Sequence, residues 1–409
     1  MSLLSREYEL RHQPNPGVRP GASYGPRQEA VLSADGVALA VSEIRGWPGY
    51  VPTPLRRLEG LAAAAGLEQL WYKDEASRFG LGSFKALGGA YAVSRMLVAA
   101  VHAQTGETAT TEDLLAGRYR TITEQVTVTC ATDGNHGRSV AWGAQQFGCR
   151  CVIYIHATVS AGREAAIARF GATVVRTAGN YDASVREASA AAARNGWIVV
   201  SDTSYPGYMD IPRHVMEGYV VMAEEAIEQL AGEVPTHVFI PGGVGGFAAA
   251  VVATFWRRYG AGRPRMVVVE PDQAACICAS AAAGEPTPVA GELDTIMAGL
   301  ACGEVSLLAW EILAEGMDDV LVLPDAAAED CMRLLAAGTA NDPPVVAGES
   351  AVAGLAGVLA ARDDPVVWKA LGLDTGARVL LFGSEGATDP EVYRRIVGRA
   401  AEEVDASWA

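Results

Sequence analysis

Residues 237–252 read HVFIPGGVGGFAAAVV, an apolar strand-forming run, a glycine loop and an Ala- and Val-rich run in succession. A strand, a tight turn and a helix in this order form the repeating unit of a parallel α/β sheet. The backbone N–H groups of the loop and of the helix start would form a cradle for an anion such as a phosphate. This segment therefore predicts an α/β fold with an anion site at the carboxyl end of one strand.

Short β-branched runs recur along the rest of the chain and alternate with Ala-rich segments of helical period. Besides 237–241, the predicted strands are 126–129, 151–155, 173–177, 197–201, 265–271, 319–324 and 378–384. Their apolar residues are continuous rather than alternating, which is typical of strands buried on both faces of a parallel sheet. Eight or more strands in 409 residues favour two lobes, each with a mostly parallel sheet flanked by helices.

Composition excludes several classes of partner and site. The formal net charge of -16 argues against nucleic acid or an anionic membrane surface as a partner. The seven cysteines form no C-x-x-C pair, which indicates reduced thiols rather than a disulfide framework or a structural metal site. No apolar run approaches the roughly 20 residues that span a bilayer, and the first residues lack the apolar core of a secretory signal. We therefore expect a soluble, cytoplasmic protein without a metal site.

The segment KDEASRFGLGSFKALGGAYAV, residues 73–93, places Lys85 after a turn rich in small residues. Gly80 and Gly82 allow a tight turn, and Ser83 offers an N-cap oxygen to the helix that follows. Because lysines are mostly exposed, a solvated helix-start residue is the simplest interpretation of Lys85. Its apolar neighbours favour another interpretation, since desolvation lowers the pKa of an amine and makes it a nucleophile able to form a Schiff base. These neighbours are Phe79, Leu81, Phe84 and Leu87.

A second polar turn, CATDGNHG at residues 130–137, follows the predicted strand 126–129. Open α/β sheets bind ligands at the carboxyl ends of their strands, so Asp133, Asn135 and His136 are candidate ligand-binding residues. Turn chemistry alone also explains Asp-Gly-Asn, because these residues tolerate left-handed backbone angles. His136 has an equally simple interpretation as a helix-start residue.

The glycine loop also fits a competing motif. Residues 243–248 match the G-x-G-x-x-G/A dinucleotide pattern, and Glu270 ends the next predicted strand where a ribose-binding acid is expected. Taken alone, this motif favours an NAD-dependent oxidoreductase. Such an enzyme needs neither the lysine turn nor the DGNHG turn. Pyridoxal 5′-phosphate (PLP) needs all three segments: an amine for its aldehyde, polar groups at its ring and a cradle for one phosphate.

These residues resemble the β-family, or fold type II, of PLP enzymes, and the match to the diaminopropionate ammonia-lyases within this family is much closer. The similar segments are 52–58, 73–92, 131–142, 201–219, 269–277, 295–304, 341–355 and 383–389. A glycine loop alone is weak evidence of kinship, whereas eight segments in order are strong. Together they cover nearly the whole chain after about residue 45.

The resemblance implies two lobes, with PLP in the cleft between them. After an irregular N-terminal arm, residues 1–30, we expect a large PLP-binding domain formed by 31–87 and 204–409. A small domain, 88–203, would be inserted into it. A small amino-acid substrate and a homodimer are expected for such an enzyme.

The resemblance also assigns the cofactor contacts. Lys85 would form the internal aldimine with Phe84 beside the cofactor, and Asn135 would contact the phenolic oxygen of the ring. Ser384 would face the pyridine nitrogen, where a neutral hydroxyl favours elimination over transamination. The implied phosphate cradle comprises Gly242, Gly243, Val244, Gly245 and Gly246.

Two aspartates are implied as catalytic bases that flank the substrate. The resemblance implies that Asp133 acts on the D enantiomer and Asp202 on the L enantiomer. A carboxylate can serve as such a base because it gains basicity in a desolvated site. An Asx turn at Asp133 and a strand-end helix cap at Asp202 are the structural alternatives. Glu349 and Ser350 are expected near the carboxylate of the substrate.

The expected reaction is the PLP-dependent α,β-elimination of 2,3-diaminopropionate, D and also L, to pyruvate and two ammonia. A serine or threonine dehydratase, or another PLP enzyme of β-elimination or β-replacement, is the alternative within the family. An NAD-dependent oxidoreductase and a non-catalytic relative are the alternatives outside it. Gly383 and Ala387 stand where bulkier polar residues are expected, which bears on substrate preference. The sequence leaves open whether Cys276 and Cys302 pair.

Overall fold

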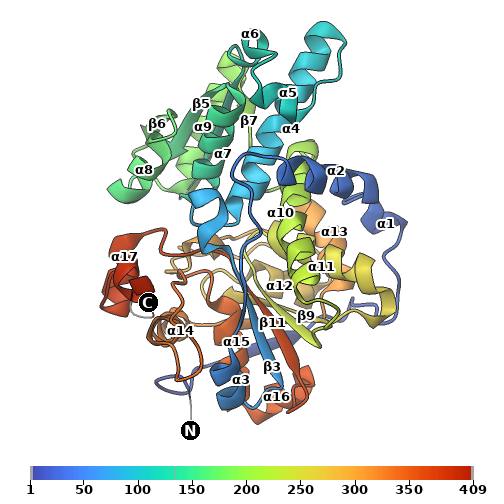
Figure 1. The fold of residues 1–409 in the computed structure, drawn as a ribbon, viewed down its shortest axis with the longest axis vertical. Helices are drawn as coiled ribbons and strands as arrows, with labels where there is room; N and C mark the ends of the chain where they lie inside the picture. The colour runs from blue at the N-terminus through green and yellow to red at the C-terminus, as the bar shows by residue number, and fades with distance from the viewer. Residues whose placement is uncertain (1–2, 133, 407–409) are drawn as a thin grey trace. The chain divides into compact units, whose positions relative to one another are not determined.

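The computed structural model describes residues 3–132 and 134–406, which fall into two compact units (Figure 1). The large unit comprises Met1–Val31, Pro52–Ser77 and Met222–Ala409, and the small unit comprises Leu32–Val51 and Arg78–Val221. The domain boundaries expected from the sequence, at 88 and 203, lie within the second segment of the small unit. Contacts therefore group 32–51, 78–87 and 204–221 with the small unit as well.

The large unit contains a seven-stranded sheet in the order β1-β10-β9-β8-β11-β3-β2. The five central strands are parallel, and the edge strands β1 and β2 pair antiparallel with their neighbours. The strand bounds are β1 (Arg11–Pro14), β2 (Leu55–Arg57), β3 (Gln69–Asp74), β8 (His237–Pro241), β9 (Arg265–Pro271), β10 (Asp319–Leu323) and β11 (Arg378–Gly383).

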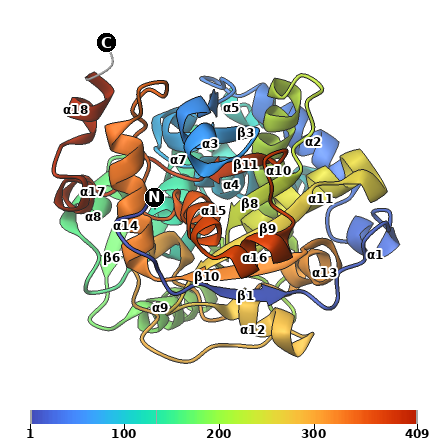
Figure 2. The ribbon, with the colours of Figure 1, turned by 90° about the horizontal axis from the view of Figure 1, so that it is seen from below.

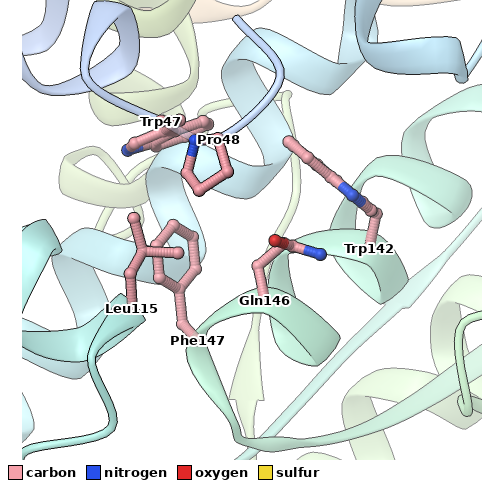
Figure 3. A pocket seen from close by; sticks show the side chains of 6 residues that line it. All are labelled: Trp47, Pro48, Leu115, Trp142, Gln146 and Phe147. Atoms are coloured by element: carbon pink, nitrogen blue, oxygen red, sulfur yellow. The ribbon is translucent and has the colours of Figure 1, made fainter.

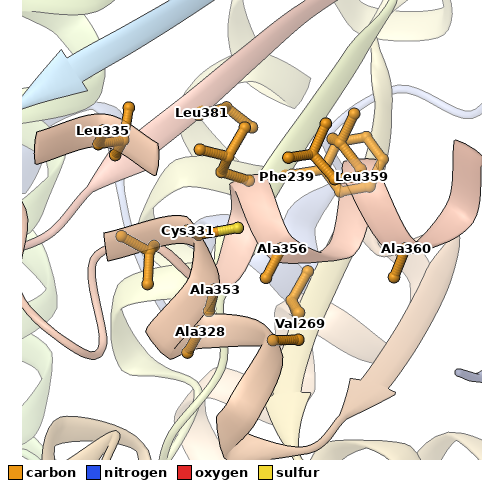
Figure 4. Close-up of a cluster of buried hydrophobic side chains, with 14 of the residues drawn as sticks. Phe239, Val269, Ala328, Cys331, Leu335, Ala353, Ala356, Leu359, Ala360 and Leu381 are labelled. Carbon is orange, nitrogen blue, oxygen red and sulfur yellow. The ribbon is translucent and has the colours of Figure 1, made fainter. Parts of the chain in front are cut away.

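Helix α15 forms the centre of the packing of the large unit and contacts β8, β9, β10 and β11 (Figure 2). Its glycines allow this close approach, because a Cβ at Gly357 would lie 3.0 Å from the Val269 side chain. Figure 4 shows Phe239 and Val269 of the sheet with Ala356 of α15 and Cys331 of α14 in the same apolar cluster. The helices are α1 (Pro26–Glu29), α3 (Glu59–Ala65), α11 (Gly246–Tyr259), α12 (Cys276–Ala283), α13 (Leu307–Gly316), α14 (Asp325–Ala337), α15 (Ala353–Asp363), α16 (Pro365–Leu371), α17 (Pro390–Val397) and α18 (Ala401–Asp405).

The small unit contains a four-stranded parallel sheet in the order β6-β5-β4-β7. Its strands are β4 (Thr127–Ala131), β5 (Arg150–Ile155), β6 (Thr173–Arg176) and β7 (Ile198–Val199). Its helices are α2 (Ala34–Arg45), α4 (Lys85–Thr105), α5 (Thr111–Leu115), α6 (Arg120–Thr123), α7 (Asn135–Phe147), α8 (Ala161–Ala168), α9 (Tyr181–Asn195) and the first part of α10 (Asp210–Gln229). All eight predicted strands are confirmed, and so are the two mostly parallel sheets.

Helix α4 packs unusually close to its neighbours in the small unit. A Cβ at Gly88 would lie 2.4 Å from the Tyr219 ring of α10, and one at Gly89 would lie 2.5 Å from Ser139 Oγ of α7. By length and composition α4 is apolar enough to cross a membrane, but 67% of that stretch is buried inside the fold. It therefore has the character of a core helix, held by contacts that leave no room for larger side chains.

Strand β3 carries a charged side chain into the interior of the large unit. Lys73 is fully buried, and its Nζ donates to Glu225 Oε2 at 2.7 Å, to Thr53 O at 2.7 Å and to Gln229 Oε1 at 2.9 Å. The Glu225 carboxylate is buried as well. Because each charge is compensated by the other, the pair is tolerated where an isolated ion would not be.

Replacing Lys73 with methionine is expected to lower the free energy of unfolding by about 3 to 5 kcal/mol, because the Glu225 carboxylate is left buried without its cation. Urea denaturation of the purified variant measures this loss. The matched control is Lys369→Met, since Lys369 is exposed on α16. A loss as small as that of the control would show that the pair is not needed for stability.

Candidate active site

The chain has three lysines, Lys73, Lys85 and Lys369, and their environments differ. The Lys73 amine is consumed by its buried ion pair, and Lys369 is exposed on α16. Lys85 is the first residue of α4, and its side chain is 16% exposed. Only this lysine is both enclosed by protein and still reachable, as an amine that reacts with an aldehyde must be.

The backbone before Lys85 takes a left-handed conformation at three positions. The φ angles are 50° at Phe79, 69° at Gly80 and 78° at Gly82. Glycine adopts such angles without strain, whereas phenylalanine does so only when its surroundings hold it. The Phe79 ring packs 4.9 Å from the Trp142 ring and 6.1 Å from the Trp47 ring.

The aromatic side chains that hold Phe79 border a small apolar pocket in the small unit (Figure 3). It is lined by Trp47, Pro48, Leu115, Trp142, Gln146 and Phe147. The expected N-cap by Ser83 is wrong, since Phe84 occupies the cap position of α4 without a side-chain hydrogen bond. The turn is thus fixed by aromatic packing.

Lys85 contacts one of the predicted catalytic aspartates within the small unit. Its Nζ donates to Asp202 Oδ2 at 2.5 Å and lies 5.4 Å from the centre of the Phe84 ring. Burial opposes ionisation of the Asp202 carboxyl, but the Lys85 ammonium holds its pKa well below its usual range. Asp202 is therefore a carboxylate whose basicity is suppressed as long as Lys85 carries its charge.

His136 is neutral and has a defined tautomer. Its Nε2 lies 2.8 Å from Val200 O, and since a carbonyl only accepts, the hydrogen is on Nε2. Burial lowers the pKa of the ring. Its Nδ1, with a free lone pair, lies 3.9 Å from Asp202 Oδ2 and has no hydrogen-bond partner among the described residues. The helix-start interpretation of His136 thus holds together with a place beside Asp202.

The order of the sheet explains why these residues meet. Strands β4 and β7 are parallel neighbours, so the residues that follow them lie at the same edge. Asn135 begins α7 after β4, and its Oδ1 accepts from Arg138 Nη2 at 2.5 Å. Asp202 follows β7. Asp133, the predicted base for the D enantiomer, lies outside the described residues.

The glycine loop of the large unit has the donors of an anion cradle. The backbone N–H groups of 243–246 donate no hydrogen bond to the residues that the structure describes. Gly245 has φ 90° and caps α11 without a side chain, so the helix N-terminus is open to a ligand. Four free amides at a helix start suit a phosphate. The residues present thus fit the phosphate group of PLP.

The loop is supported from behind by the turn 298–302. A Cβ at Gly243 would lie 2.9 Å from Gly299 O and 3.5 Å from Cys302 Sγ. Neither Cys276 nor Cys302 is in a disulfide with a described residue, and Cys276 Sγ donates to Gly243 O at 3.6 Å. The thiols therefore pack against the cradle.

Glu270 does not have the place that the dinucleotide motif requires. It is fully buried, and its Oε1 and Oε2 accept from the backbone N–H groups of Ile277 and Cys278, both at 2.8 Å. Burial raises its pKa to about 8. Both oxygens thus bind the first turn of α12, and the full burial of Glu270 keeps it out of reach of a ribose, which removes the main support for an NAD enzyme.

Ser384 follows β11, the parallel neighbour of β8, and β8 leads into the glycine loop. The topology therefore places the predicted partner of the ring nitrogen and the phosphate cradle at one edge of the large sheet. The residue before it, Gly383, makes room for a neighbour, because a Cβ there would lie 2.1 Å from the Tyr72 hydroxyl. Tyr72 is itself buried.

Ser350 and Glu349 are buried in the large unit beside the same turns. Ser350 Oγ accepts from Gly299 N at 3.1 Å, and Ser350 N donates to Glu385 Oε1 at 3.1 Å. These bonds tie the Ser384 turn to the turn behind the cradle. Contact of Glu349 and Ser350 with the substrate carboxylate stays a prediction. The bracing role of Glu385 has no signal in a single sequence.

Comparison with known proteins agrees with this geometry. Residues 47–367 match a family model described as pyridoxal-phosphate dependent enzyme. The chain is 42% identical over 355 residues to diaminopropionate ammonia-lyase of Escherichia coli K12, covering 85% of this chain and 88% of that protein.

Two crystal structures of the E. coli diaminopropionate ammonia-lyase are similar at 37% identity. The complex with D-serine has a TM-score of 0.87 and covers 97% of this chain and 99% of that one. The complex with an aminoacrylate-PLP azomethine reaction intermediate has a TM-score of 0.85 and covers 95% and 97%. The fold and the open amides of the glycine loop thus coincide with similarity to proteins that hold PLP.

Proposed function

Because the chain belongs to the pyridoxal-phosphate dependent enzyme family, we propose that it eliminates ammonia from 2,3-diaminopropionate and yields pyruvate and a second ammonia. The observation that carries this proposal is the contact of Lys85 with Asp202, an amine for the cofactor beside a carboxylate able to take a proton. The identity to diaminopropionate ammonia-lyase supports the choice of substrate.

Bound PLP supplies an aldehyde and a conjugated ring that make the Cα proton of an amino acid acidic. Lys85 would hold the aldehyde and the 242–246 loop the phosphate, while Asn135 and Ser384 would contact the ring. Phe84 lies against Tyr219 at 4.7 Å between ring centres and forms an apolar wall beside the Lys85 amine. This wall shields one side of the amine.

Asp202 changes its character when Lys85 loses its charge. In the free protein the ammonium holds the carboxylate ionised and weakly basic. Without that positive charge, desolvation would be the main remaining effect and would raise the proton affinity of Asp202. The carboxylate would then be able to take the Cα proton of the L enantiomer. The departing β-nitrogen must carry a proton, since an amide ion is too basic to leave.

The charge of the site favours a diamino acid. Asp202 remains negative until it takes a proton. The DGNHG segment supplies a second carboxylate, that of Asp133. These groups attract the additional ammonium of 2,3-diaminopropionate, which serine and threonine lack. A serine or threonine dehydratase is the second candidate, because the similar E. coli enzyme binds D-serine in its crystal structure.

The proposal is tested by measuring the release of pyruvate or 2-oxobutyrate from five substrates. These are D- and L-2,3-diaminopropionate, D- and L-serine and L-threonine. The expected kcat/KM for diaminopropionate exceeds that for serine by at least roughly tenfold, because a site built for a charged group rejects a substrate without it. Faster turnover of serine would establish the dehydratase instead. The homodimer and the cytoplasmic location stay predictions, and analytical ultracentrifugation tests the first.

A further inference from the structure

The residue before Asp202 is held by a tyrosine that follows later in the chain. Tyr208 reaches back, so that its hydroxyl donates to Val199 O at 2.8 Å and accepts from Ser201 N at 3.0 Å. Both bonds go to the backbone on either side of Val200. Since burial raises the pKa of Tyr208, its hydroxyl keeps the hydrogen that the first bond needs.

The loop between these residues has a defined shape. Tyr205 and Tyr208 exchange backbone hydrogen bonds of 2.9 and 3.3 Å, and Gly207 between them has φ 85°. The two rings stack at 4.9 Å with an interplanar angle of 15°. Tyr205 covers the outer face of the pair and is 51% exposed. The Tyr208 hydroxyl is thus presented to the backbone from a rigid turn.

Val200 is fixed from two other directions. Its N–H donates to Thr129 O of β4 at 2.8 Å, and its carbonyl accepts from His136 Nε2 at 2.8 Å. The chain from 199 to 201 is therefore held by the sheet, by His136 and by Tyr208. Asp202 is the next residue, so its carboxylate position depends on these anchors.

We propose that Tyr208 is a positioning residue that holds Asp202 for proton removal, so that turnover of the L enantiomer depends on it. The inference rests on the proposed function, in which Asp202 acts on L and Asp133 on D. In the sequence Asp133 lies between β4 and α7, and the Tyr208 hydroxyl makes no hydrogen bond to the described residues of 127–147. Loss of the Tyr208 hydroxyl is therefore expected to slow turnover of the L enantiomer and to leave turnover of the D enantiomer unchanged.

The test is Tyr208→Phe in the holoenzyme, with Tyr205→Phe as the matched control. The second variant also loses a hydroxyl from the stacked pair, but it keeps both hydrogen bonds of the Tyr208 hydroxyl to residues 199–201. Because a shift of about 1 Å can cost 10²-fold, we expect kcat for L-diaminopropionate to fall roughly tenfold or more. We expect little change in KM and less than about a twofold change for the D enantiomer.

A second readout uses the cofactor-free protein. Ser201 N–H donates to the Tyr208 hydroxyl, so its hydrogen exchange should be faster in Tyr208→Phe than in the wild type or Tyr205→Phe. This measurement does not depend on turnover. It therefore tests the hydrogen bonds of Tyr208 to residues 199–201 separately from the proposed function. Failure of the proposed function would appear as no turnover of either enantiomer by the wild type.

Several results would overturn the inference. Equal losses for the two enantiomers in Tyr208→Phe would show a general structural role. An unchanged ratio of L to D turnover would show that Asp202 keeps its place without the Tyr208 hydroxyl. Unchanged hydrogen exchange at Ser201 N–H would show that this hydroxyl does not hold residues 199–201. If Asp202→Asn itself affected D and L alike, the basis for an enantiomer-specific clamp would be removed.

Discussion

Lys85→Ala is expected to abolish turnover of every amino acid, with a fall in kcat of roughly 10³-fold or more, because no amine remains to bond the aldehyde of the cofactor and to move protons at it. The other two lysines cannot replace it. Lys73 is locked in its ion pair with Glu225, and Lys369 lies exposed on α16. Pyruvate release and the yellow colour of the purified protein measure the effect.

The different lysine environments also predict which lysine the cofactor labels. Borohydride reduction of the holoenzyme should bleach the colour and place a pyridoxyl group on the peptide with Lys85, and Lys369→Ala should leave this result unchanged. A pyridoxyl group on the Lys73 or Lys369 peptide would contradict the assignment. A colourless wild-type protein that binds NADH would contradict the cofactor itself.

Asp202→Asn is expected to lower kcat for L-2,3-diaminopropionate by roughly 10²- to 10⁴-fold and to spare the D enantiomer. Asparagine has the size of aspartate but cannot take the Cα proton. The steady-state kinetics of both enantiomers measure the effect. Asp210→Asn is the matched control, since the Asp210 carboxylate is exposed at the start of α10. Equal loss for both enantiomers would refute the division of roles between Asp133 and Asp202.

Strands β4 to β11 could be predicted from sequence because each is a continuous apolar run. Strands β1, β2 and β3 lack that pattern and were not predicted. Residues 11–14 read RHQP and form β1 only by pairing with β10. Strand β3 ends in Lys73 and Asp74, which look like surface residues until the buried partner of Lys73, Glu225, is known. Tertiary contacts therefore decide strands of this kind.

The site shows the same division. Lys85, Asn135 and Asp202 could be predicted because each follows a recognisable strand or glycine turn. The dinucleotide motif that ends in Glu270 stayed a competing alternative at the level of sequence, because the sequence does not reveal that both carboxylate oxygens bind the start of α12. Tyr208 could not be predicted, because its hydrogen bonds go to backbone atoms that carry no side-chain signature.

Gly383 and Tyr72 have a consequence for how this family can diverge. The Tyr72 ring fills the space where any side chain at position 383 would begin. A larger residue at 383, of the kind expected from the resemblance, is therefore compatible only with a smaller residue at position 72. We therefore expect the two positions to covary among homologues, with a larger residue at 383 accompanied by a smaller one at 72.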